Sequence, residues 1–185
     1  MRIISGKFKG RVLSSFQADH IRPTMDRVKE TLFNKWMHHV QDAALLDLFA
    51  GTGSLGLEAL SRGALRVDFV EKNTQSLQII SKNIEMLKIS KNDYSVVKKD
   101  VVQFLQTYSG APYALIVIDP PFTEKMAHSV MQALDASRCY DESTLIAIES
   151  IKQERIDVEY SQIIRYDFKD YGDKILSFFQ KKEQS

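Results

Sequence analysis

Short runs of apolar residues alternate with helical patterns through most of this chain, and this alternation restricts the possible folds more than any other feature. The runs have the length and composition of buried strands, and between them apolar residues recur every third or fourth position. Repeated strand-helix-strand units predict a parallel sheet with right-handed crossovers and helices on both faces. The expected strands cover residues 44–49, 66–71, 94–97, 113–118 and 145–148.

The last part of the chain departs from this alternation. Two further strands are expected at residues 163–168 and 174–179, and Asp170-Tyr171-Gly172-Asp173 between them is typical of a hairpin turn. We therefore predict an α/β fold with a doubly wound, Rossmann-like sheet that is mostly parallel and ends in a C-terminal antiparallel hairpin. In such sheets, ligands bind outside the carboxyl ends of the strands.

The segment before the first buried strand predicts two smaller elements. Residues 2–4 and 11–13 have the composition of short strands, and Gly6 and Gly10 permit the positive φ angles that a β-hairpin needs. A helix is expected after Pro23. Thr24 can cap this helix, and its apolar residues recur every fourth position at Val28, Leu32, Trp36 and Val40.

Composition excludes several classes of protein. A chain of 185 residues, 44% of them hydrophobic, can bury a core without disulfides or a structural metal, and we assign the single Cys139 no role. The four histidines have no metal-ligand spacing. No apolar run approaches the ~20 residues that span a bilayer, so we expect a cytoplasmic protein with no membrane partner. The net charge is only +1, but the first 40 residues carry eight Lys or Arg against three Asp or Glu.

A glycine-rich loop follows the first buried strand. The segment Asp47-Leu48-Phe49-Ala50-Gly51-Thr52-Gly53-Ser54-Leu55-Gly56 contains G-x-G-x-x-G between a strand and a helix, the context in which this pattern binds nucleosides. Gly51 allows a tight turn, Gly53 lets the backbone approach a ligand, and Gly56 permits close packing of helix on strand. Glu71 lies 20 residues after Gly51, at the end of the next strand, where a carboxylate can accept both ribose hydroxyls.

Other residues near the strand ends favour S-adenosylmethionine over NAD as the nucleoside. Asp47 would repel a pyrophosphate, but it can orient the ammonium of a methionine moiety through water or backbone amides. Asp100, which closes the third strand, can accept a hydrogen bond from an adenine amino group while Val101 offers its amide to the ring, although Asp100 equally suits a helix N-cap. Phe49, within the loop, completes the candidate cofactor residues. The expected product is S-adenosylhomocysteine.

The run Asp119-Pro120-Pro121-Phe122 follows the most apolar strand and predicts the chemistry of the site. Consecutive prolines donate no backbone hydrogen bond and hold the chain extended, which leaves their carbonyls available to a cleft. The amino group of a base is a poor nucleophile because its lone pair is delocalised into the ring. Hydrogen bonds to the Asp119 carboxylate and the Pro120 carbonyl can aim this lone pair at a methyl group while Phe122 stacks on the base. Positioning, which can supply about 7 to 11 kcal/mol, is expected to contribute more than proton transfer.

With both motifs present, the chain resembles the RsmD family of bacterial 16S ribosomal RNA guanine-N2 methyltransferases over nearly its whole length. Three further segments carry the resemblance: Arg2-Ile3-Ile4-Ser5-Gly6-Lys7 with Gly10-Arg11, Arg22-Pro23-Thr24-Met25-Asp26-Arg27-Val28-Lys29-Glu30-Thr31-Leu32-Phe33-Asn34, and Gly56-Leu57-Glu58-Ala59-Leu60-Ser61-Arg62-Gly63. The second of these segments discriminates best, because the glycine-rich loop and Asp-Pro-Pro-Phe recur among many amino-methyltransferases.

The resemblance implies roles for the motif residues. In a class I methyltransferase of this family, residues Asp119, Pro120, Pro121 and Phe122 would orient the guanine amino group. Glu71 would hold the ribose and Asp100 the adenine of S-adenosylmethionine, and Arg22 and Thr24 would border the cofactor pocket.

The resemblance also implies ribosomal RNA, or an assembly intermediate of the small ribosomal subunit, as the substrate of a monomeric enzyme without a metal. Cations interleaved with Phe8 suit phosphate contacts plus stacking. The candidate RNA-binding residues are Arg2, Lys7, Lys9 and Arg11. We therefore divide the chain into an N-terminal basic β-hairpin extension, residues 1–20, and an S-adenosylmethionine-dependent methyltransferase domain, residues 21–185.

Other functions remain open at the level of the motifs. An exocyclic amine is present on guanine N2 and on adenine N6, so the motif chemistry alone is also compatible with an adenine-N6 methyltransferase acting on DNA or RNA. A non-catalytic RNA-binding Rossmann-like domain would keep the fold without turnover, but the intact Asp119 argues against it. An NAD-linked oxidoreductase lacks a convincing proton relay, and a serine hydrolase lacks G-x-S-x-G.

Overall fold

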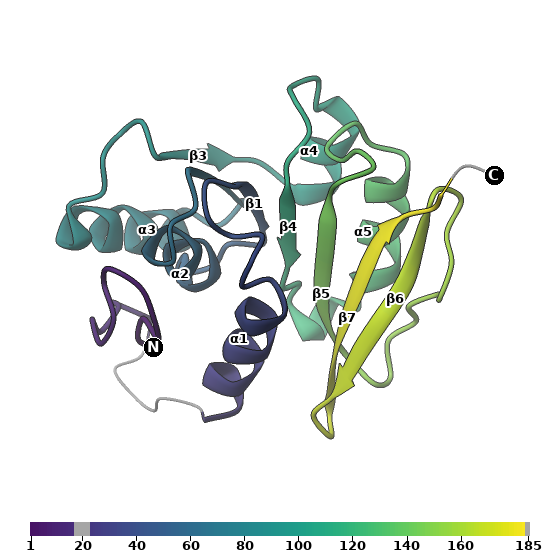
Figure 1. Ribbon diagram of the computed structural model, residues 1–185, viewed down its shortest axis with the longest axis horizontal. Helices are drawn as coiled ribbons and strands as arrows, with labels where there is room; N and C mark the ends of the chain where they lie inside the picture. The colour runs from purple at the N-terminus through teal and green to yellow at the C-terminus, as the bar shows by residue number, and fades with distance from the viewer. Residues whose placement is uncertain (17–22, 184–185) are drawn as a thin grey trace.

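The computed structural model of the chain describes residues 1–16 and 23–183, which contain a seven-stranded sheet. Its strand order is β3-β2-β1-β4-β5-β7-β6; the pairs from β3 to β5 are parallel, and β7 runs antiparallel to both β5 and β6 (Figure 1). The predicted mostly parallel sheet with a C-terminal antiparallel hairpin is confirmed. The strands are β1 Ala44–Leu48, β2 Arg66–Glu71, β3 Tyr94–Lys98, β4 Leu115–Ile118, β5 Leu145–Ile151, β6 Ile163–Asp170 and β7 Lys174–Lys181.

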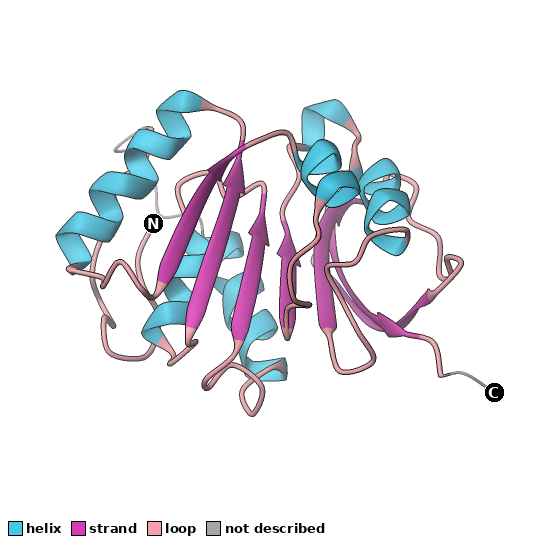
Figure 2. Cartoon of the chain, turned by 90° about the horizontal axis from the view of Figure 1, so that it is seen from above, coloured by secondary structure: helices cyan, strands magenta, loops and turns pink. Residues whose placement is uncertain are grey.

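Helices cover both faces of the sheet (Figure 2). They are α1 Pro23–Lys35, α2 Ser54–Ser61, α3 Thr74–Leu87, α4 Val101–Thr107, the 3-10 turn η1 Phe122–Glu124 and α5 Ala127–Asp135. One buried cluster packs α1, α2 and α3 against the sheet and includes Trp36 and Phe69. The second cluster packs α4 and α5 against the opposite face and includes Phe104 and Met131.

The strand register determines which side chains share a face at the carboxyl edge. Leu48 of β1 pairs with Ile118 of β4, which in turn pairs with Ile148 of β5. These residues belong to the α4–α5 face, so their neighbours along each strand point to the other face. Asp47, Asp119 and Glu149 are those neighbours, and the side chains of all three therefore lie on the face that α1 and α2 cover.

Helix α1 begins and ends at different residues from those predicted. It starts at Pro23, so Thr24 lies in its first turn and is not its cap; proline suits this position because the first backbone N–H groups of a helix have no partner within it. The helix ends at Lys35. Trp36 and Val40 lie beyond it, but both are buried, because the turn that contains them packs into the same core.

The N-terminal segment contains one isolated bridge, and the prediction of strands at residues 2–4 and 11–13 was wrong in extent. Arg2 and Val12 form an antiparallel bridge. The N–H of Ile3 donates to the carbonyl of Arg11 at 2.9 Å, and the residues between them form turns. The segment is thus a hairpin-like loop rather than a pair of strands.

The ladder stops because the next backbone groups bond to helix α2. The N–H groups of Ile4 and Ser5 donate to the two carboxylate oxygens of Glu58, at 2.7 and 3.0 Å. The N–H of Lys7 donates to the carbonyl of Ser61 at 2.7 Å. The N-terminal loop is therefore docked on α2; the boundary predicted at residue 20 lies outside the described residues.

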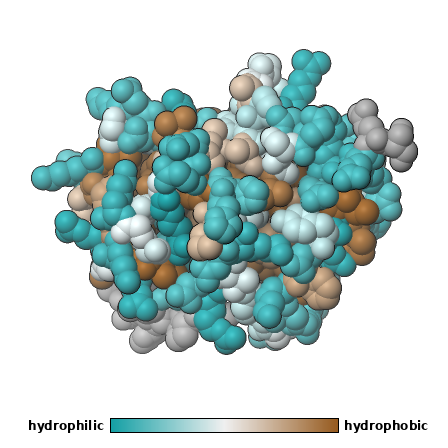
Figure 3. All heavy atoms as spheres, in the orientation of Figure 1, coloured by the Kyte–Doolittle hydropathy of each residue, from teal (hydrophilic) through white to brown (hydrophobic). Residues whose placement is uncertain are grey.

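The side of the molecule seen in Figure 3 is mostly hydrophilic, with apolar side chains showing between the polar ones. In the part of the chain that the structure describes, none of the helices is both long enough and apolar enough to cross a membrane.

Candidate active site

The loop between β1 and α2 has the backbone of a tight turn. Phe49, Gly51 and Gly53 all have positive φ, at 62°, 56° and 80°. The N–H of Gly53 donates to the carbonyl of Ala50 at 2.7 Å. The loop therefore uses both of its first two motif glycines in a conformation that other residues rarely adopt, and Phe49 adopts it without being glycine.

Gly56 permits the close packing that its position in the motif predicts. A Cβ atom there would lie 2.3 Å from the ring of Phe69 and 2.7 Å from the side chain of Val67. Helix α2 thus lies so close to β2 that no larger residue fits without movement. The N–H of Gly56 also donates to Asp47 at 2.9 Å, which ties the first turn of α2 to the end of β1.

Asp47 is buried, with 1% of its surface exposed, rather than solvated at the strand end. Burial raises the pKa of its carboxyl to about 8; the hydrogen bond from Gly56 opposes this rise, and the nearby carboxylates of Asp119 and Glu71 add to it. A positive charge placed beside these carboxylates would stabilise their ionised forms.

Glu71 joins the two loops that follow β1 and β2. Its carboxylate accepts hydrogen bonds from the N–H of Gly51 at 2.9 Å and from the N–H of Asn73 at 2.7 Å. The carboxylate is thus held directly over the glycine loop, as its distance from Gly51 in the sequence predicts.

Asp100 is the N-cap of α4. Its Oδ1 accepts hydrogen bonds from the N–H groups of Val102 and Gln103, at 3.0 and 3.3 Å. Its Oδ2 lies 4.0 Å from the Nζ of Lys72. The Val101 N–H stands at the first helical position, where backbone N–H groups have no partner within a helix. The capping role therefore uses one oxygen of Asp100 and leaves the other outside the cap.

Asp119 to Phe122 leave the carboxyl end of β4 in the middle of the sheet. The carbonyl of Pro121 accepts the N–H of Glu124, at 3.1 Å, and Phe122 begins the 3-10 turn. No N–H or O–H group of the described residues donates to the Pro120 carbonyl. Asp119 and Pro120 thus present two acceptors at one strand end.

Glu149 and Lys174 are site residues that the sequence did not indicate. Glu149 follows Ile148 on β5 as Asp119 follows Ile118 on β4, so the two carboxylates are neighbours across the sheet. Burial raises the pKa of Asp119 to about 7, the Glu149 carboxylate raises it further, and Lys174 opposes the rise. The only sequence signal for Glu149 is a charged residue within an otherwise apolar strand.

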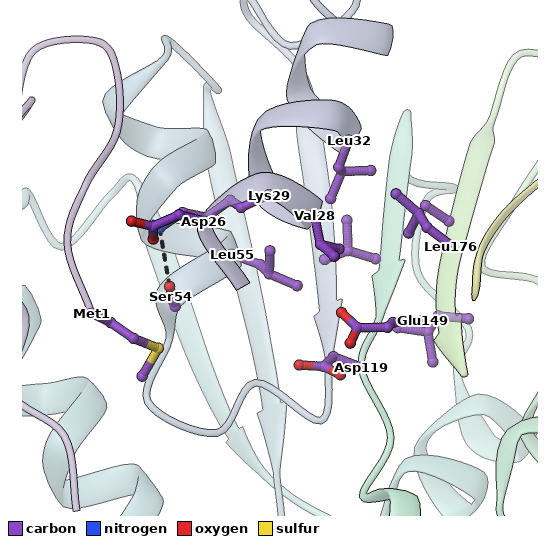
Figure 4. A pocket seen from close by; sticks show the side chains of 13 residues that line it. Met1, Asp26, Val28, Lys29, Leu32, Ser54, Leu55, Asp119, Glu149 and Leu176 are labelled. Carbon is purple, nitrogen blue, oxygen red and sulfur yellow. Dashed lines mark hydrogen bonds between the residues drawn. The ribbon is translucent and has the colours of Figure 1, made fainter. Parts of the chain in front are cut away.

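A pocket beside Asp119 opens between α1, α2 and the sheet (Figure 4). Asp119 and Glu149 lie together on one side of it, and Asp26, Lys29 and Ser54 lie on the other. Lys29 is buried; its Nζ donates to the carbonyl of Arg2 at 2.6 Å and to the hydroxyl of Ser54 at 3.3 Å. The pocket is otherwise lined mainly by apolar side chains: Met1, Val28, Leu32, Leu55, Val117, Ile118, Ala147 and Leu176.

The same face of four neighbouring strands ends in a carboxylate: Glu71 on β2, Asp47 on β1, Asp119 on β4 and Glu149 on β5. This charge suits a ligand that carries an ammonium and a sulfonium, and the glycine loop beside it suits a nucleoside. The residues present therefore fit S-adenosylmethionine. A dinucleotide fits less well, because its pyrophosphate would lie against the acidic edge.

Two predicted cofactor residues are not placed by the structure. Arg22 lies outside the described residues, and Thr24 is described only in its backbone. Among the predicted RNA contacts, Arg2 forms an ion pair with Asp26 at 3.2 Å.

The remaining predicted RNA contacts, Lys7, Lys9 and Arg11, are exposed on the N-terminal loop. Among residues 1–16 and 23–183, no group of three His, Cys, Asp or Glu side chains is arranged to hold a metal ion.

Known proteins match the chain over most of its length. A family model described as "Conserved hypothetical protein 95" matches residues 1–180. Ribosomal RNA small subunit methyltransferase D of Haemophilus influenzae is 37% identical over 153 residues, which cover 82% of this chain and 79% of that protein. The protein of the same name from Escherichia coli is 37% identical over 150 residues, 81% of this chain and 74% of that protein.

The fold agrees with this match. The solved structure of yhhF from Escherichia coli has a TM-score of 0.86 and 30% sequence identity, and the superposition covers 100% of this chain and 99% of that one. Together with the family model, these relatives show that the chain belongs to the RsmD family of methyltransferases.

Proposed function

We propose that this protein transfers a methyl group from S-adenosylmethionine to the exocyclic N2 amino group of a guanine in small-subunit (16S) ribosomal RNA. The observation that carries the proposal is the pair of acceptors at the end of β4, the Asp119 carboxylate and the Pro120 carbonyl, beside a loop built for a nucleoside. Two relatives at 37% identity are named ribosomal RNA small subunit methyltransferase D, and they supply the RNA class.

The cofactor would lie over the glycine loop at the carboxyl edge. Glu71, which accepts the Gly51 N–H in this structure, would accept the ribose hydroxyls. The Oδ2 of Asp100 would accept from the adenine amino group, and the Val101 N–H would donate to the ring. Asp47 would attract the ammonium through the backbone it holds at Gly56, and Arg22 and Thr24 would border the methionine end.

The reaction follows from where the acceptors lie. S-adenosylmethionine supplies a methyl group on a sulfonium sulfur, which keeps the electron pair of the broken carbon–sulfur bond. Asp119 and Pro120 accept one hydrogen bond each from the N2 amino group and thereby hold its lone pair toward the methyl carbon. Phe122 stacks on the base. Once the new nitrogen–carbon bond has formed, Asp119 takes the proton that the nitrogen releases, a role that suits a carboxyl with a pKa of about 7.

The exposed cations of the N-terminal loop would bind the RNA backbone. Lys7, Lys9 and Arg11 surround Phe8, whose ring lies 5.0 Å from the Lys7 Nζ. Phosphate contacts of this kind set affinity rather than sequence preference. We also propose that the substrate is the RNA or an assembly intermediate of the small subunit, and that the enzyme acts in the cytoplasm as a monomer.

Two experiments test this function. Methyl-labelled S-adenosylmethionine should transfer label to 16S RNA, or to small subunits, from cells that lack the enzyme. An absence of label in both substrates would favour a binding-only protein. Calorimetry should give binding of S-adenosylhomocysteine and none of NAD; binding of NAD alone would favour an oxidoreductase.

A further inference from the structure

We infer that Glu149 is a second base-recognition residue that accepts the N1–H of the target guanine beside Asp119, so that the two carboxylates together select guanine over adenine. This inference rests on the proposed function. It concerns which base enters the site, not whether a methyl group is transferred.

The sheet places Glu149 where such a residue is needed. Asp119 and Glu149 each follow the last paired residue of adjacent parallel strands, and adjacent strands lie about 4.8 Å apart. Both side chains line the same pocket, and Figure 4 shows their carboxylates next to each other on one side of it. A base whose amino group reaches Asp119 therefore presents the next atom of its edge to Glu149.

Lys174 fixes the direction of this second acceptor. Its Nζ donates to the Oε1 of Glu149 and lies 4.0 Å from the centre of the Phe122 ring. No described residue donates to the Oε2 of Glu149. Lys174 thus joins the Glu149 carboxylate to the ring on which the base would stack, and it leaves one oxygen available to the base.

The two candidate bases differ at the atom next to the amino group. On guanine, N1 beside the N2 amino group carries a hydrogen and donates; on adenine, N1 beside the N6 amino group is an acceptor. Asp119 and Glu149 form two adjacent acceptors, which match two adjacent donors. Adenine would instead place the N1 lone pair against the Glu149 carboxylate, leaving a buried acceptor without a donor.

The test replaces the target guanosine by 2-aminopurine riboside, which keeps the 2-amino group but has an N1 acceptor. Mass spectrometry of RNA fragments first locates the methylated nucleotide, and the analogue is then introduced there by ligation of two RNA pieces. The wild-type enzyme should methylate the analogue at least about tenfold more slowly than guanosine, the scale of a hydrogen bond to a charged acceptor. Equal kcat/KM values would overturn the inference without any variant.

Glu149→Gln provides the second arm, because the glutamine amide can donate to the N1 of the analogue. We expect the ratio of kcat/KM for guanosine to that for 2-aminopurine to fall at least about tenfold in this variant. Comparing ratios cancels the intrinsic reactivity of the two bases. The control is Glu142→Gln, which also removes a carboxylate paired with a lysine of β7, Lys181, but at an exposed position; its ratio should equal that of the wild type.

The outcomes separate this inference from the proposed function. If Glu149→Gln loses activity equally on both bases, or keeps the wild-type ratio, while still binding S-adenosylhomocysteine, Glu149 does not recognise the base and the inference fails alone. If the wild-type enzyme produces N6-methyladenosine or no methylated nucleoside, the proposed function itself fails.

Discussion

Asp47 occupies a position where ionisation is unfavourable in the folded protein. Its carboxyl is buried, and its pKa is raised from 3.8 to about 8 by that burial and by the carboxylates nearby. A raised pKa means that the folded state holds a proton that the unfolded state has lost. Stability is therefore fully present below about pH 4 and is lost as the pH rises toward 8.

Asp47→Asn should stabilise the protein without ligand, because an asparagine oxygen can still accept the Gly56 N–H and carries no charge. We expect a gain of about 1 to 3 kcal/mol in the free energy of unfolding near pH 8 and little gain near pH 4. Urea denaturation at several pH values measures this. A difference between variant and wild type that does not grow with pH would contradict the burial of an ionisable carboxyl, and weaker S-adenosylhomocysteine binding should accompany the gain.

Asp119 addresses the base rather than the cofactor, so its removal should separate turnover from binding. In Asp119→Ala we expect methyl transfer to fall by at least about a hundredfold, the scale on which a lost polar contact to the reacting group acts. S-adenosylhomocysteine affinity, measured by calorimetry, should persist. Asp173→Ala, at an exposed position in the β6–β7 turn, is the matched control. Loss of cofactor affinity in Asp119→Ala would refute this division of roles.

At the scale of elements, Glu58 connects the N-terminal loop to α2. Its buried carboxylate accepts two backbone N–H groups of the loop and forms ion pairs with Lys29 at 3.4 Å and Arg62 at 2.7 Å. Burial lowers the pKa of Lys29, and the Glu58 charge opposes this change. The carboxylate therefore satisfies groups from three separate segments.

Glu58→Gln should weaken this junction because an amide has only one acceptor oxygen and no charge. We expect a loss of about 3 to 5 kcal/mol in stability, the range for a buried ion pair that loses one partner. The amide hydrogens of Ile4 and Ser5 should exchange faster. Glu85→Gln, on the exposed side of α3, is the control. Unchanged exchange at Ile4 and Ser5 would show that Glu58 does not hold the loop.

The order of the elements could be predicted because it depends on local periodicity, which the apolar strands and amphipathic helices display clearly. The strands of the N-terminal loop were not, because their backbone groups bond to Glu58 and Ser61, more than 50 positions away. The site was predicted where motifs are contiguous, as in Asp119 to Phe122. Glu149 and Lys174 were missed since their pairing depends on how β7 aligns with β5, which neither segment reveals alone.

At the scale of the whole molecule, charge is separated between the two ends of the chain. The first 40 residues carry eight of the 25 Lys and Arg residues but only three of the 24 Asp and Glu residues. The acidic residues of the site lie at the carboxyl edge, where a cationic cofactor would partly neutralise them. We therefore assign the attraction for RNA to the exposed N-terminal cations rather than to the site.

Replacing Lys7, Lys9 and Arg11 by alanine should weaken RNA binding and make it less dependent on salt. Each lost phosphate contact should reduce the slope of log affinity against log salt by about 0.7 to 0.9. The control variant replaces Lys88, Lys91 and Arg138, which are exposed near the amino ends of the strands. A slope that equals the wild-type slope would exclude the N-terminal loop from the RNA interface.

The central claim is the identity of the methylated group, and nucleoside mass spectrometry measures it directly. Small-subunit RNA from cells without the enzyme is incubated with the protein and labelled S-adenosylmethionine, then digested to nucleosides. We expect the label in N2-methylguanosine. Label in N6-methyladenosine, or in no nucleoside, would contradict the account.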